Sequence, residues 1–401
     1  MGLMLALQDS IFKGMTMHIE PSAVVEAILK TPIRNIVGVP DSTLYPFLSL
    51  LEKRDEMKAL IATNECEAVG IAAGQFMATQ VPSLVYLQNS GLGKTIHPIA
   101  TLLHNEICAL PFVLMIGWRG APDISDEPQH KIMGKKIFEL LNVLNIEHKV
   151  LEPNAENIEA DFKYAYRFCL EKRQPFALVV HPRLFPKEKN KDLNAPMEGL
   201  NRTSVLKILV ELLPHCSMVS TTGKISRELY EIRKEKFSGA DFFTVGAMGD
   251  ASSIALGIEL GLNSKASQRS KPIMRLDAKP TVVLDGDGAF LMQMGSLVTI
   301  GTSEANLLHI VFDNGCHEST GGQPTAARKV NLSKIAEACG YSQVYQAEDE
   351  KNLREAISQA LKTNSGPKFI HVKVHPGDIK TLGRPVETPR ENTDAFMKRF
   401  V

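Results

Sequence analysis

The sequence has no excess charge of either sign, no closely paired cysteines and no long apolar run. Lys plus Arg and Asp plus Glu number 45 each over 401 residues, so no field of the whole chain would draw it to nucleic acid or to an anionic membrane. The six cysteines are scattered without a C-x-x-C pair, which gives no indication of a disulfide framework or a zinc site. We therefore expect a protein of the reducing cytoplasm.

No uninterrupted apolar stretch approaches the roughly 20 residues that a membrane-spanning helix needs. Residues 1–16 contain a short apolar run but no basic leader and no clear small-residue cleavage site. They are interpreted as an N-terminal extension rather than a signal peptide. With 44% hydrophobic and 22% charged residues, the composition is that of an ordinary globular protein. The sequence thus predicts neither a membrane nor a nucleic-acid partner.

Short β-branched apolar runs recur along the chain, and nearly all end in or beside Gly, Pro, Asp, Asn or Ser. Their hydrophobicity is continuous rather than alternating, which is typical of strands buried on both faces of a parallel sheet. Helix-like stretches lie between them at 64–79, 204–213 and 351–362. Strands alternating with helices predict an α/β fold with a doubly wound parallel sheet in each half. The runs are 35–40, 83–90, 112–117 and 176–182, then 217–223, 281–288, 307–314 and 368–374.

A charged stretch separates the two halves of the chain. Residues 184–200 contain two prolines and show no strand or helix periodicity. Doubly wound sheets bind ligands outside the C-terminal ends of their strands, so functional residues should follow the apolar runs directly. The predicted organisation is an extension at 1–16, a domain at 17–185, a linker at 186–200, a second domain at 201–385 and a C-terminal tail at 386–401.

Two candidate oxygen ligands follow neighbouring apolar runs of the second half. Gly286 and Gly288 bracket Asp287; such glycines let the backbone approach a phosphate, and the amides from Ala289 onward can face the anion. Asp287 is a hard oxygen ligand suited to magnesium or calcium. Asn314 stands 27 positions later, a separation that fits a crossover helix and the end of the adjacent strand. Gly, Asp and Asn also favour ordinary turns, which leaves plain loops as the alternative.

The G-D-G followed by an asparagine at this spacing resembles the signature of thiamine-diphosphate enzymes. In that family the aspartate and the last asparagine bind a metal ion through their side chains, and a backbone carbonyl two residues later is a third ligand. The resemblance therefore implies Mg²⁺ held by Asp287, Asn314 and the carbonyl of Cys316, with the metal holding the diphosphate of thiamine diphosphate. The usual Asn-Asn pair is Asp313-Asn314 in this chain.

The first half offers a candidate for the group that activates this cofactor. A carboxylic group at the pyrimidine ring of thiamine favours its reactive form, while the cofactor does the organic chemistry. In the family this glutamate precedes a glycine by nine residues, a relation that Glu65 has to Gly74 and that Glu67 lacks. The alternative is that both glutamates serve only the start of a helix, where the macrodipole favours them.

The same resemblance implies further cofactor contacts. Gly246 and Met248 precede a helix and match the family segment that holds the pyrimidine ring and wedges the cofactor into its V shape; a glycine turn with a core methionine is the alternative. Gly223 and Lys224 belong to a T-T-G-K stretch that is expected to bind the cofactor. The domain at 17–185 would then bind the pyrimidine and the domain at 201–385 the diphosphate. Because the family draws these two sites from different subunits, the resemblance also implies self-association with active sites at subunit interfaces.

Several further loops resemble one branch of the family, the phosphonopyruvate decarboxylases. This branch lacks the central third domain of larger thiamine-dependent decarboxylases, in agreement with the chain length. The resemblance implies decarboxylation of phosphonopyruvate, a small-molecule substrate, to phosphonoacetaldehyde and carbon dioxide. It places Asp41 and His130 at the reacting centre, where they could move protons; a helix cap and an ordinary hydrogen-bonded histidine are the alternatives. The matching loops are 38–42, 88–93, 126–130, 221–224 and 314–323.

The substrate is less constrained by these motifs than the cofactor. A phosphonate needs cationic or amide donors, and the motifs offer several without a basis for choosing. Lysine and histidine at positions 94 and 97 replace asparagines that are more frequent in the family, and Asp250 replaces a frequent histidine. Two rival functions follow: a sulfopyruvate decarboxylase, and a catalytically silent thiamine-fold partner subunit, which should have lost a key residue. The candidate phosphonate donors are Lys94, Arg119, Lys224 and His317.

Overall fold

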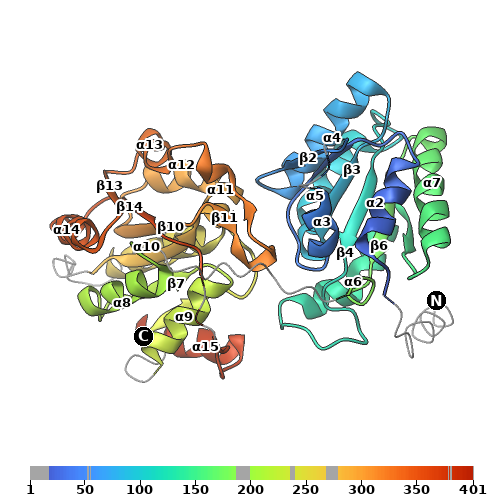
Figure 1. Ribbon diagram of the computed structural model, residues 1–401. Helices are drawn as coiled ribbons and strands as arrows, with labels where there is room; N and C mark the ends of the chain where they lie inside the picture. The colour runs from blue at the N-terminus through green and yellow to red at the C-terminus, as the bar shows by residue number, and fades with distance from the viewer. Residues whose placement is uncertain are drawn as a thin grey trace. The chain divides into compact units, whose positions relative to one another are not determined.

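The chain forms two compact units, Met1–Asn190 and Lys191–Val401 (Figure 1). The computed structural model describes residues 18–51, 54, 56–186, 199–234, 240–267, 279–377, 379 and 382–400. The predicted N-terminal extension at 1–16 and residues 187–198 of the predicted linker lie outside the described residues.

A six-stranded parallel sheet organises the first unit, in the order β2-β1-β3-β4-β6-β5. The chain passes from β1 to one edge of the sheet and from β3 toward the other, so the order reverses between β1 and β3. In sheets of this kind a ligand crevice opens at that reversal, beyond the C-terminal strand ends. The strands are β1 Asn35–Gly38, β2 Lys58–Ile61, β3 Leu84–Gln88, β4 Val113–Gly117, β5 Glu147–Val150 and β6 Phe176–Val180.

Helices cover both faces of this sheet, and the strands supply side chains to each face in turn. In β4, Val113 and Met115 pack on one face while Leu114 and Ile116 pack on the other, because successive strand residues point to opposite sides. All four side chains are fully buried, and each contributes about 1.5–3 kcal/mol to folding by its burial. One face carries α2 Pro21–Leu29, α3 Tyr45–Leu51 and α7 Ala155–Lys172; the other carries α4 Glu65–Thr79, α5 Leu92–Pro98, η2 Ile99–Leu103 and α6 His130–Val143.

The second unit repeats this plan. Its large sheet has the order β13-β14-β10-β9-β7-β8 and is also parallel. When the strands of each large sheet are counted in chain order within their own unit, both sheets have the same order, 2-1-3-4-6-5. The reversal that opens a crevice therefore lies between β7 and β9. The strands are β7 Met218–Ser220, β8 Asp241–Phe243, β9 Thr281–Gly286, β10 Leu307–Asp313, β13 Gln343–Ala347 and β14 Lys368–Lys373, with a small hairpin of β11 Cys316–His317 and β12 Gln323–Pro324.

Two apolar clusters again lie on the two faces of the sheet. The predicted C-terminal tail contributes to one of them, because α15 packs against β8 and its Phe396 is only 4% exposed. One face carries α8 Arg202–Leu212, α9 Lys224–Arg233 and α14 Glu350–Ala360; the other carries α10 Ala251–Ser267, α11 Asp287–Met292, α12 Gly295–Gly301, α13 Leu332–Ala338 and α15 Pro389–Met397.

The prediction of two doubly wound parallel sheets is confirmed. The eight predicted runs correspond to the four central strands of each sheet. The edge strands β2, β5, β8 and β13 were not predicted, because their side chains are partly exposed and form no continuous apolar run. Within the described ranges, no helix has both the length and the apolar character needed to cross a membrane.

Candidate functional site

Three loops line one pocket in the second unit. They follow β7, β9 and β10, which are adjacent and parallel, with Ser220 paired to Leu284 and Gly286 paired to Phe312. Their C-terminal ends therefore lie at the same edge of the sheet, around the order reversal between β7 and β9. The pocket is lined by these loops, by the starts of the elements that follow them, and by Arg202, Met248 and Val374; the residues after the strands are Thr221–Ile225, Asp287–Ala289, Asn314 and Cys316–Ser319, and the strands contribute Gly286 and Phe312.

Asp287 is one of two carboxylates that line this pocket, the other being Glu318. Asp287 is the first residue of α11, directly after β9, and only 3% of it is exposed. Its donors are the Thr325 hydroxyl and main-chain amides, which carry no full positive charge. Burial raises the pKa of Asp287 to about 7. A bound cation would favour the ionised form in these surroundings, so the site fits a metal ion.

Asn314 and Cys316 complete a set of hard oxygen donors. The carboxamide Oδ1 of Asn314 accepts a hydrogen bond from the Cys316 amide at 3.0 Å, and its Nδ2 donates to Oε2 of Glu318 at 3.0 Å. An amide oxygen has a second lone pair available for a metal. A carboxylate, a carboxamide and a peptide carbonyl suit Mg²⁺, which usually takes further oxygens from a phosphate. The roles of Asp287, Asn314 and Cys316 stay predictions.

The loop after β7 and the start of α9 offer donors to a diphosphate. Gly223 precedes α9 with φ of +106°, a conformation that favours glycine. The first amides of α9 have no partner within the helix and carry partial positive charge, and this turn lines the pocket. A Cβ at Gly288 would lie 3.1 Å from Cε1 of His317. The close packing at Gly288 leaves little room for a side chain, as expected of a backbone that a phosphate approaches.

Lys224 and His317 both line the pocket, but they differ in charge. The Lys224 ammonium lies 3.5 Å from Oε1 of Glu318. Burial lowers the pKa of His317 to about 4, so this imidazole is neutral near pH 7 and offers hydrogen bonds without charge. Of the two, only Lys224 would bring a positive charge to an anion.

The loop between β8 and α10 contains Gly246 and Met248. Met248 lines the pocket, as a side chain in contact with the cofactor should. Gly246 stands two residues earlier in the same loop. Asp250, one of the departures from the family pattern, accepts a hydrogen bond from the Gln293 side chain at 3.1 Å.

In the first unit, Glu65 is the first residue of α4 and is 7% exposed. Among the described residues, its Oε2 has no hydrogen-bond partner, and the Lys94 ammonium lies 3.9 Å from it. The other oxygen, Oε1, lies so close to Gly91 that a Cβ there would be 2.3 Å away. A buried carboxylate oxygen with open bonding capacity fits a nitrogen-bearing ring, so the residue suits the pyrimidine.

Glu67 has a different environment. It is exposed, and its Oε2 accepts hydrogen bonds from the amide and hydroxyl of Thr63 at 2.8 and 2.6 Å. The amide of Glu67 in turn donates to the N-cap residue Asn64 at 2.9 Å. Glu67 therefore stabilises the start of α4, in keeping with the choice of Glu65 as the candidate activator.

Asp41 lies at the order reversal of the first sheet. It follows β1 and is fully buried. Its Oδ1 accepts a hydrogen bond from the Thr43 amide at 3.0 Å, and its Oδ2 accepts one from Gln88 Nε2, at the end of β3, at 2.7 Å. A Cβ at Gly117 would lie 2.0 Å from Oδ1. The carboxylate thus has a fixed position between three strand ends.

Arg119 and Asp126 fix the loop after β4. Two guanidinium nitrogens of Arg119 donate to Asp126 at 2.8 and 2.6 Å, and a third donates to the Ser42 hydroxyl at 3.0 Å. Burial acts to raise the pKa of Asp126, but the bonds from Arg119 and from backbone amides hold it well below the usual range. The pair is therefore charged throughout the neutral pH range.

His130 is the first residue of α6, at the end of this loop. It is 8% exposed, and within the described part of the chain its Nδ1 has no hydrogen-bond partner. Burial, and then the charge of Arg119, lower the pKa of His130. A neutral imidazole with an open nitrogen can accept or transfer a proton.

Some residues around these sites were not predicted. Gln88 and Glu318 stand inside the motifs, but no pattern in the sequence assigns them a role. Thr325 and Arg202 lie outside every motif. Thr325 contacts Asp287, 38 residues away in the sequence, and Arg202 contacts Glu318, 116 residues away. The position of Glu318 inside the 314–323 motif is a sequence feature, but its burial and its contact with Asn314 are seen only in the structure.

Comparisons with known proteins identify two cofactor-binding domains in the chain. Residues 21–140 match the thiamine pyrophosphate enzyme N-terminal TPP binding domain, and residues 222–372 match the C-terminal TPP binding domain. Thiamine pyrophosphate is another name for thiamine diphosphate. Two doubly wound units with these domains define the class of thiamine-diphosphate enzymes.

The chain is 32% identical to a phosphonopyruvate decarboxylase of Streptomyces viridochromogenes, and the match covers 91% of this chain and 90% of that protein. A phosphonopyruvate decarboxylase of Streptomyces hygroscopicus matches at the same identity and coverage. A sulfopyruvate decarboxylase of Methanosarcina acetivorans is 26% identical, covering 93% of this chain and 95% of that protein. The chain belongs to the phosphonopyruvate decarboxylase family of thiamine-diphosphate-dependent carboxy-lyases.

Proposed function

We propose that the chain decarboxylates phosphonopyruvate to phosphonoacetaldehyde and carbon dioxide, with thiamine diphosphate and Mg²⁺ bound. The observation that carries this proposal is the 32% identity to both Streptomyces enzymes along nearly the whole chain. The sulfopyruvate enzyme matches over a similar length at 26%. The polar set at the strand ends of the first unit, with one buried carboxylate and one neutral histidine, supports a reaction that moves protons.

Residues of the second unit would hold the cofactor. Asp287, Asn314 and the carbonyl of Cys316 are proposed to bind Mg²⁺. When bound, thiamine diphosphate supplies a carbon nucleophile and an electron sink for the decarboxylation. The proposed contacts to its diphosphate and rings are Gly223, Lys224, Gly246, Met248, Gly286, Gly288 and Ala289.

Residues of the first unit would move protons. Oε2 of Glu65 is proposed to share a proton with a ring nitrogen of the cofactor, since this oxygen has open bonding capacity and is shielded from water. His130 would accept or return a proton at the reacting centre through its free Nδ1. Asp41, held by Gln88 and Thr43, would orient the substrate or take part in the same transfer.

Lys94 and Arg119 are the two cations proposed to bind the phosphonate. His317 is neutral, and Lys224 lies beside the loops proposed for the diphosphate. Lys94 and Arg119 belong to the same unit as Asp41 and His130. Arg119 has a rigid fork oriented by Asp126, and a planar guanidinium suits the oxygens of a phosphonate.

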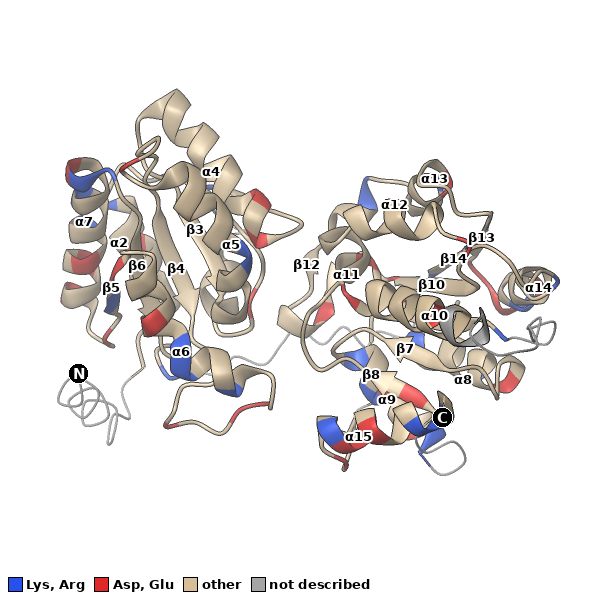
Figure 2. Cartoon of the chain, turned by 180° about the vertical axis from the view of Figure 1, so that it is seen from behind, with Lys and Arg blue, Asp and Glu red and all other residues tan. Residues whose placement is uncertain are grey.

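We further propose that two or more copies associate, and that each active site takes Glu65 from one copy and the metal ligands from another. The surface of α4 supports this. After Glu67 the helix has no charged residue, and its Met77 is 64% exposed. Figure 2 shows charges of both signs along α7, whereas α4 carries almost none. Depletion of charge is typical of the centre of a protein–protein interface.

Turnover of the two rival substrates tests the proposal. Carbon dioxide release would be measured with phosphonopyruvate and with sulfopyruvate, each with thiamine diphosphate and Mg²⁺ added or withheld. We expect release from phosphonopyruvate to depend on both additions and to be faster than release from sulfopyruvate. Equal rates, or a preference for the sulfonate, would show that the substrate is wrong. No turnover of either acid would instead favour a silent partner subunit, against which the retention of Glu65, Asp287 and Asn314 argues.

A further inference from the structure

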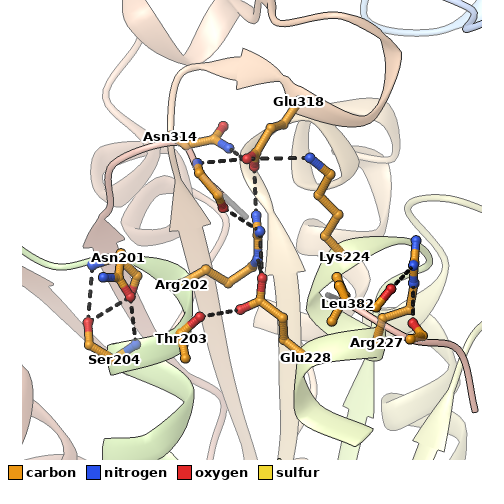
Figure 3. Close-up of polar contacts among 12 residues, drawn as sticks. Asn201, Arg202, Thr203, Ser204, Lys224, Arg227, Glu228, Asn314, Glu318 and Leu382 are labelled. Atoms are coloured by element: carbon orange, nitrogen blue, oxygen red, sulfur yellow. Dashed lines mark hydrogen bonds and ion pairs between the residues drawn. The ribbon is translucent and has the colours of Figure 1, made fainter. Parts of the chain in front are cut away.

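A single carboxylate, that of Glu318, collects hydrogen-bond and ion-pair partners from four segments of the second unit (Figure 3). Its Oε2 accepts from Arg202 Nη1 at 2.6 Å and from Asn314 Nδ2 at 3.0 Å. Its Oε1 accepts from the Gly377 amide at 2.7 Å and lies 3.5 Å from the Lys224 ammonium. Glu318 therefore connects a candidate metal ligand, Asn314, with a candidate diphosphate contact, Lys224.

Glu318 belongs to a buried cluster whose charges balance. Arg202 also donates through Nε and Nη2 to Oε1 of Glu228 at 2.9 and 2.7 Å, and Thr203 donates to Oε2 of Glu228 at 2.8 Å. Arg202, Glu228 and Glu318 are 6%, 0% and 7% exposed. With Lys224, the cluster holds two positive and two negative groups. Buried charges persist only when paired and hydrogen-bonded in this way, so Glu318 has little freedom to move.

The fixed carboxylate determines how the Asn314 carboxamide is turned. Nδ2 can only donate and Oδ1 can only accept; here Nδ2 meets Glu318 and Oδ1 meets the Cys316 amide. Turning the carboxamide by half a rotation would place its oxygen against the Glu318 carboxylate and its NH₂ group against an N–H. Both new contacts would be repulsive. Only one orientation of Asn314 is therefore compatible with the cluster.

We propose that Glu318, held by Arg202, is a positioning residue that keeps the oxygen of Asn314 available to the metal ion. The Arg202 contact also keeps the Glu318 carboxylate engaged, so that it does not itself become a metal ligand. Groups that orient metal ligands commonly set the affinity of a site, and changing them costs about 10- to 100-fold. This inference rests on the proposed metal site at Asp287 and Asn314.

The alternative is a purely structural cluster. Arg202 Nη2 also donates to the Gly377 carbonyl at 2.7 Å, so the cluster joins α8, α9 and the segment after β14. Loss of Glu318 would then lower the free energy of unfolding without a specific effect on metal binding. A control must therefore destabilise the unit to a similar degree away from the pocket.

Asp241→Asn provides that control. Asp241 forms a buried ion pair with Arg233, with 2.8 Å between Oδ2 and Nε and exposures of 2% and 1%. It lies at the start of β8 in the same unit as Glu318. Like Glu318, it is a buried carboxylate that is paired with a buried arginine.

The test is calorimetric titration of Mg²⁺ into the full-length protein with saturating thiamine diphosphate, without substrate. We expect Glu318→Ala to weaken Mg²⁺ binding by about 10- to 100-fold and Asp241→Asn to change it by less than about threefold, although both lower the melting temperature. Wild-type affinity in Glu318→Ala, or an equal loss in Asp241→Asn, would overturn the inference.

A second variant covers the case in which Glu318→Ala does not fold. Glu318→Gln keeps the size of the side chain but can satisfy only one of the two donor pairs that meet the carboxylate, so we expect Mg²⁺ affinity between that of Glu318→Ala and the wild type. Unchanged affinity in Glu318→Gln would overturn the positioning role. Failure of the wild-type protein to bind thiamine diphosphate with Mg²⁺ would instead refute the proposed metal site itself.

Discussion

Glu65 and Glu67 lie two positions apart on one helix, and their carboxylates have different partners. Glu67 is bonded to Thr63 at the helix start, while an oxygen of Glu65 has no hydrogen-bond partner among the described residues. Substituting each glutamate by glutamine can separate these roles, because a carboxamide has nearly the shape of a carboxylate but is not an acid.

We expect Glu65→Gln to lower kcat by at least about 100-fold, since a glutamine cannot exchange a proton, with thiamine diphosphate still bound. Glu67→Gln is the matched control and should keep kcat within a few-fold while lowering the melting temperature slightly. Steady-state kinetics with phosphonopyruvate and calorimetric binding of the cofactor would measure both. Unaltered turnover in Glu65→Gln would remove the residue from the mechanism.

His130 gives a prediction for pH dependence. Its pKa in the folded chain lies below the ordinary value of 6.5, because burial and Arg119 outweigh the acids Asp126, Glu127 and Asp41. The unfolded chain therefore takes up a proton near pH 6.5 that the folded chain does not. The contribution of His130 to the free energy of unfolding is complete above that pH. It is lost as the pH falls toward the pKa of His130 in the folded chain, by up to about 1.4 kcal/mol per pH unit.

The measurement compares wild-type protein with His130→Gln by urea unfolding between about pH 7.5 and 5.5. We expect the wild type to lose more stability than the variant as the solution is acidified. The difference between the two curves isolates His130, because the other titrating groups occur in both proteins. Parallel curves would mean that the histidine is protonated alike in the folded and unfolded chains.

The sequence predicts Asp287 and Asn314 from a spacing that fits a strand end, a crossover helix and the next strand end, and it predicts Glu65 from the resemblance of its segment to the family; their roles stay predictions. The sequence could not supply the residues that hold them. The contacts that hold these residues depend on how distant or turning segments pack: Gly91 lies against Glu65, Thr325 against Asp287 and Glu318 against Asn314. A local pattern contains no information of that kind.

At the level of elements, burial separates what could be predicted from what could not. Strands with neighbours on both sides are covered by helices on both faces, so they are written in the sequence as unbroken apolar runs. Edge strands such as β2 and β5 have exposed or half-exposed side chains, including charged ones. Lysine and glutamate on an edge also prevent pairing with other chains. The exposed and charged residues that protect these edge strands from pairing also leave no apolar run from which the strands could be predicted.

The starts of α4 and α5 lie against each other where Gly91 meets Glu65. A Cβ at Gly91 would come within 2.3 Å of the Glu65 carboxylate, and the backbone there has φ of −77°, which alanine adopts freely. The movable carboxylate should therefore yield rather than the fold. We expect Gly91→Ala to lower kcat by roughly 10- to 100-fold, as misplaced reacting groups do, with little change in the melting temperature.

Gly93→Ala is the matched control for this element. A Cβ at Gly93 would have no described atom within 4 Å, and alanine is the better helix former by about 1 kcal/mol. This variant should be as active as the wild type and equally or more stable. Equal kcat in Gly91→Ala would show that the approach of α5 does not fix the Glu65 carboxylate.

At the scale of the whole molecule, the two units repeat one strand order and place their polar loops at the same order reversal. One unit holds the candidate proton-transferring residues and the other the candidate cofactor ligands. If sites form between copies, two inactive variants should restore activity when assembled together, since each supplies what the other lacks.

We expect co-refolded or co-expressed Glu65→Gln and Asp287→Ala chains to reach about one quarter of wild-type activity, because random pairing in a twofold dimer gives half mixed dimers with one intact site of two. Each variant alone should be nearly inactive. Activity assays on the mixture, with sedimentation to measure the assembly, provide the test. A mixture as inactive as its components would indicate that each chain uses its own Glu65 and Asp287.

The separate pair of apolar clusters in each unit has a consequence for biosynthesis. Domains with their own cores generally fold as units while the ribosome is still translating, at about 5–20 residues per second. The first unit, Met1–Asn190, can therefore complete its core while the rest of the chain is still being made, a delay on the order of 10–40 s at these rates. Such a nascent chain would bury its apolar surface early, which limits its exposure to chaperones and to premature aggregation.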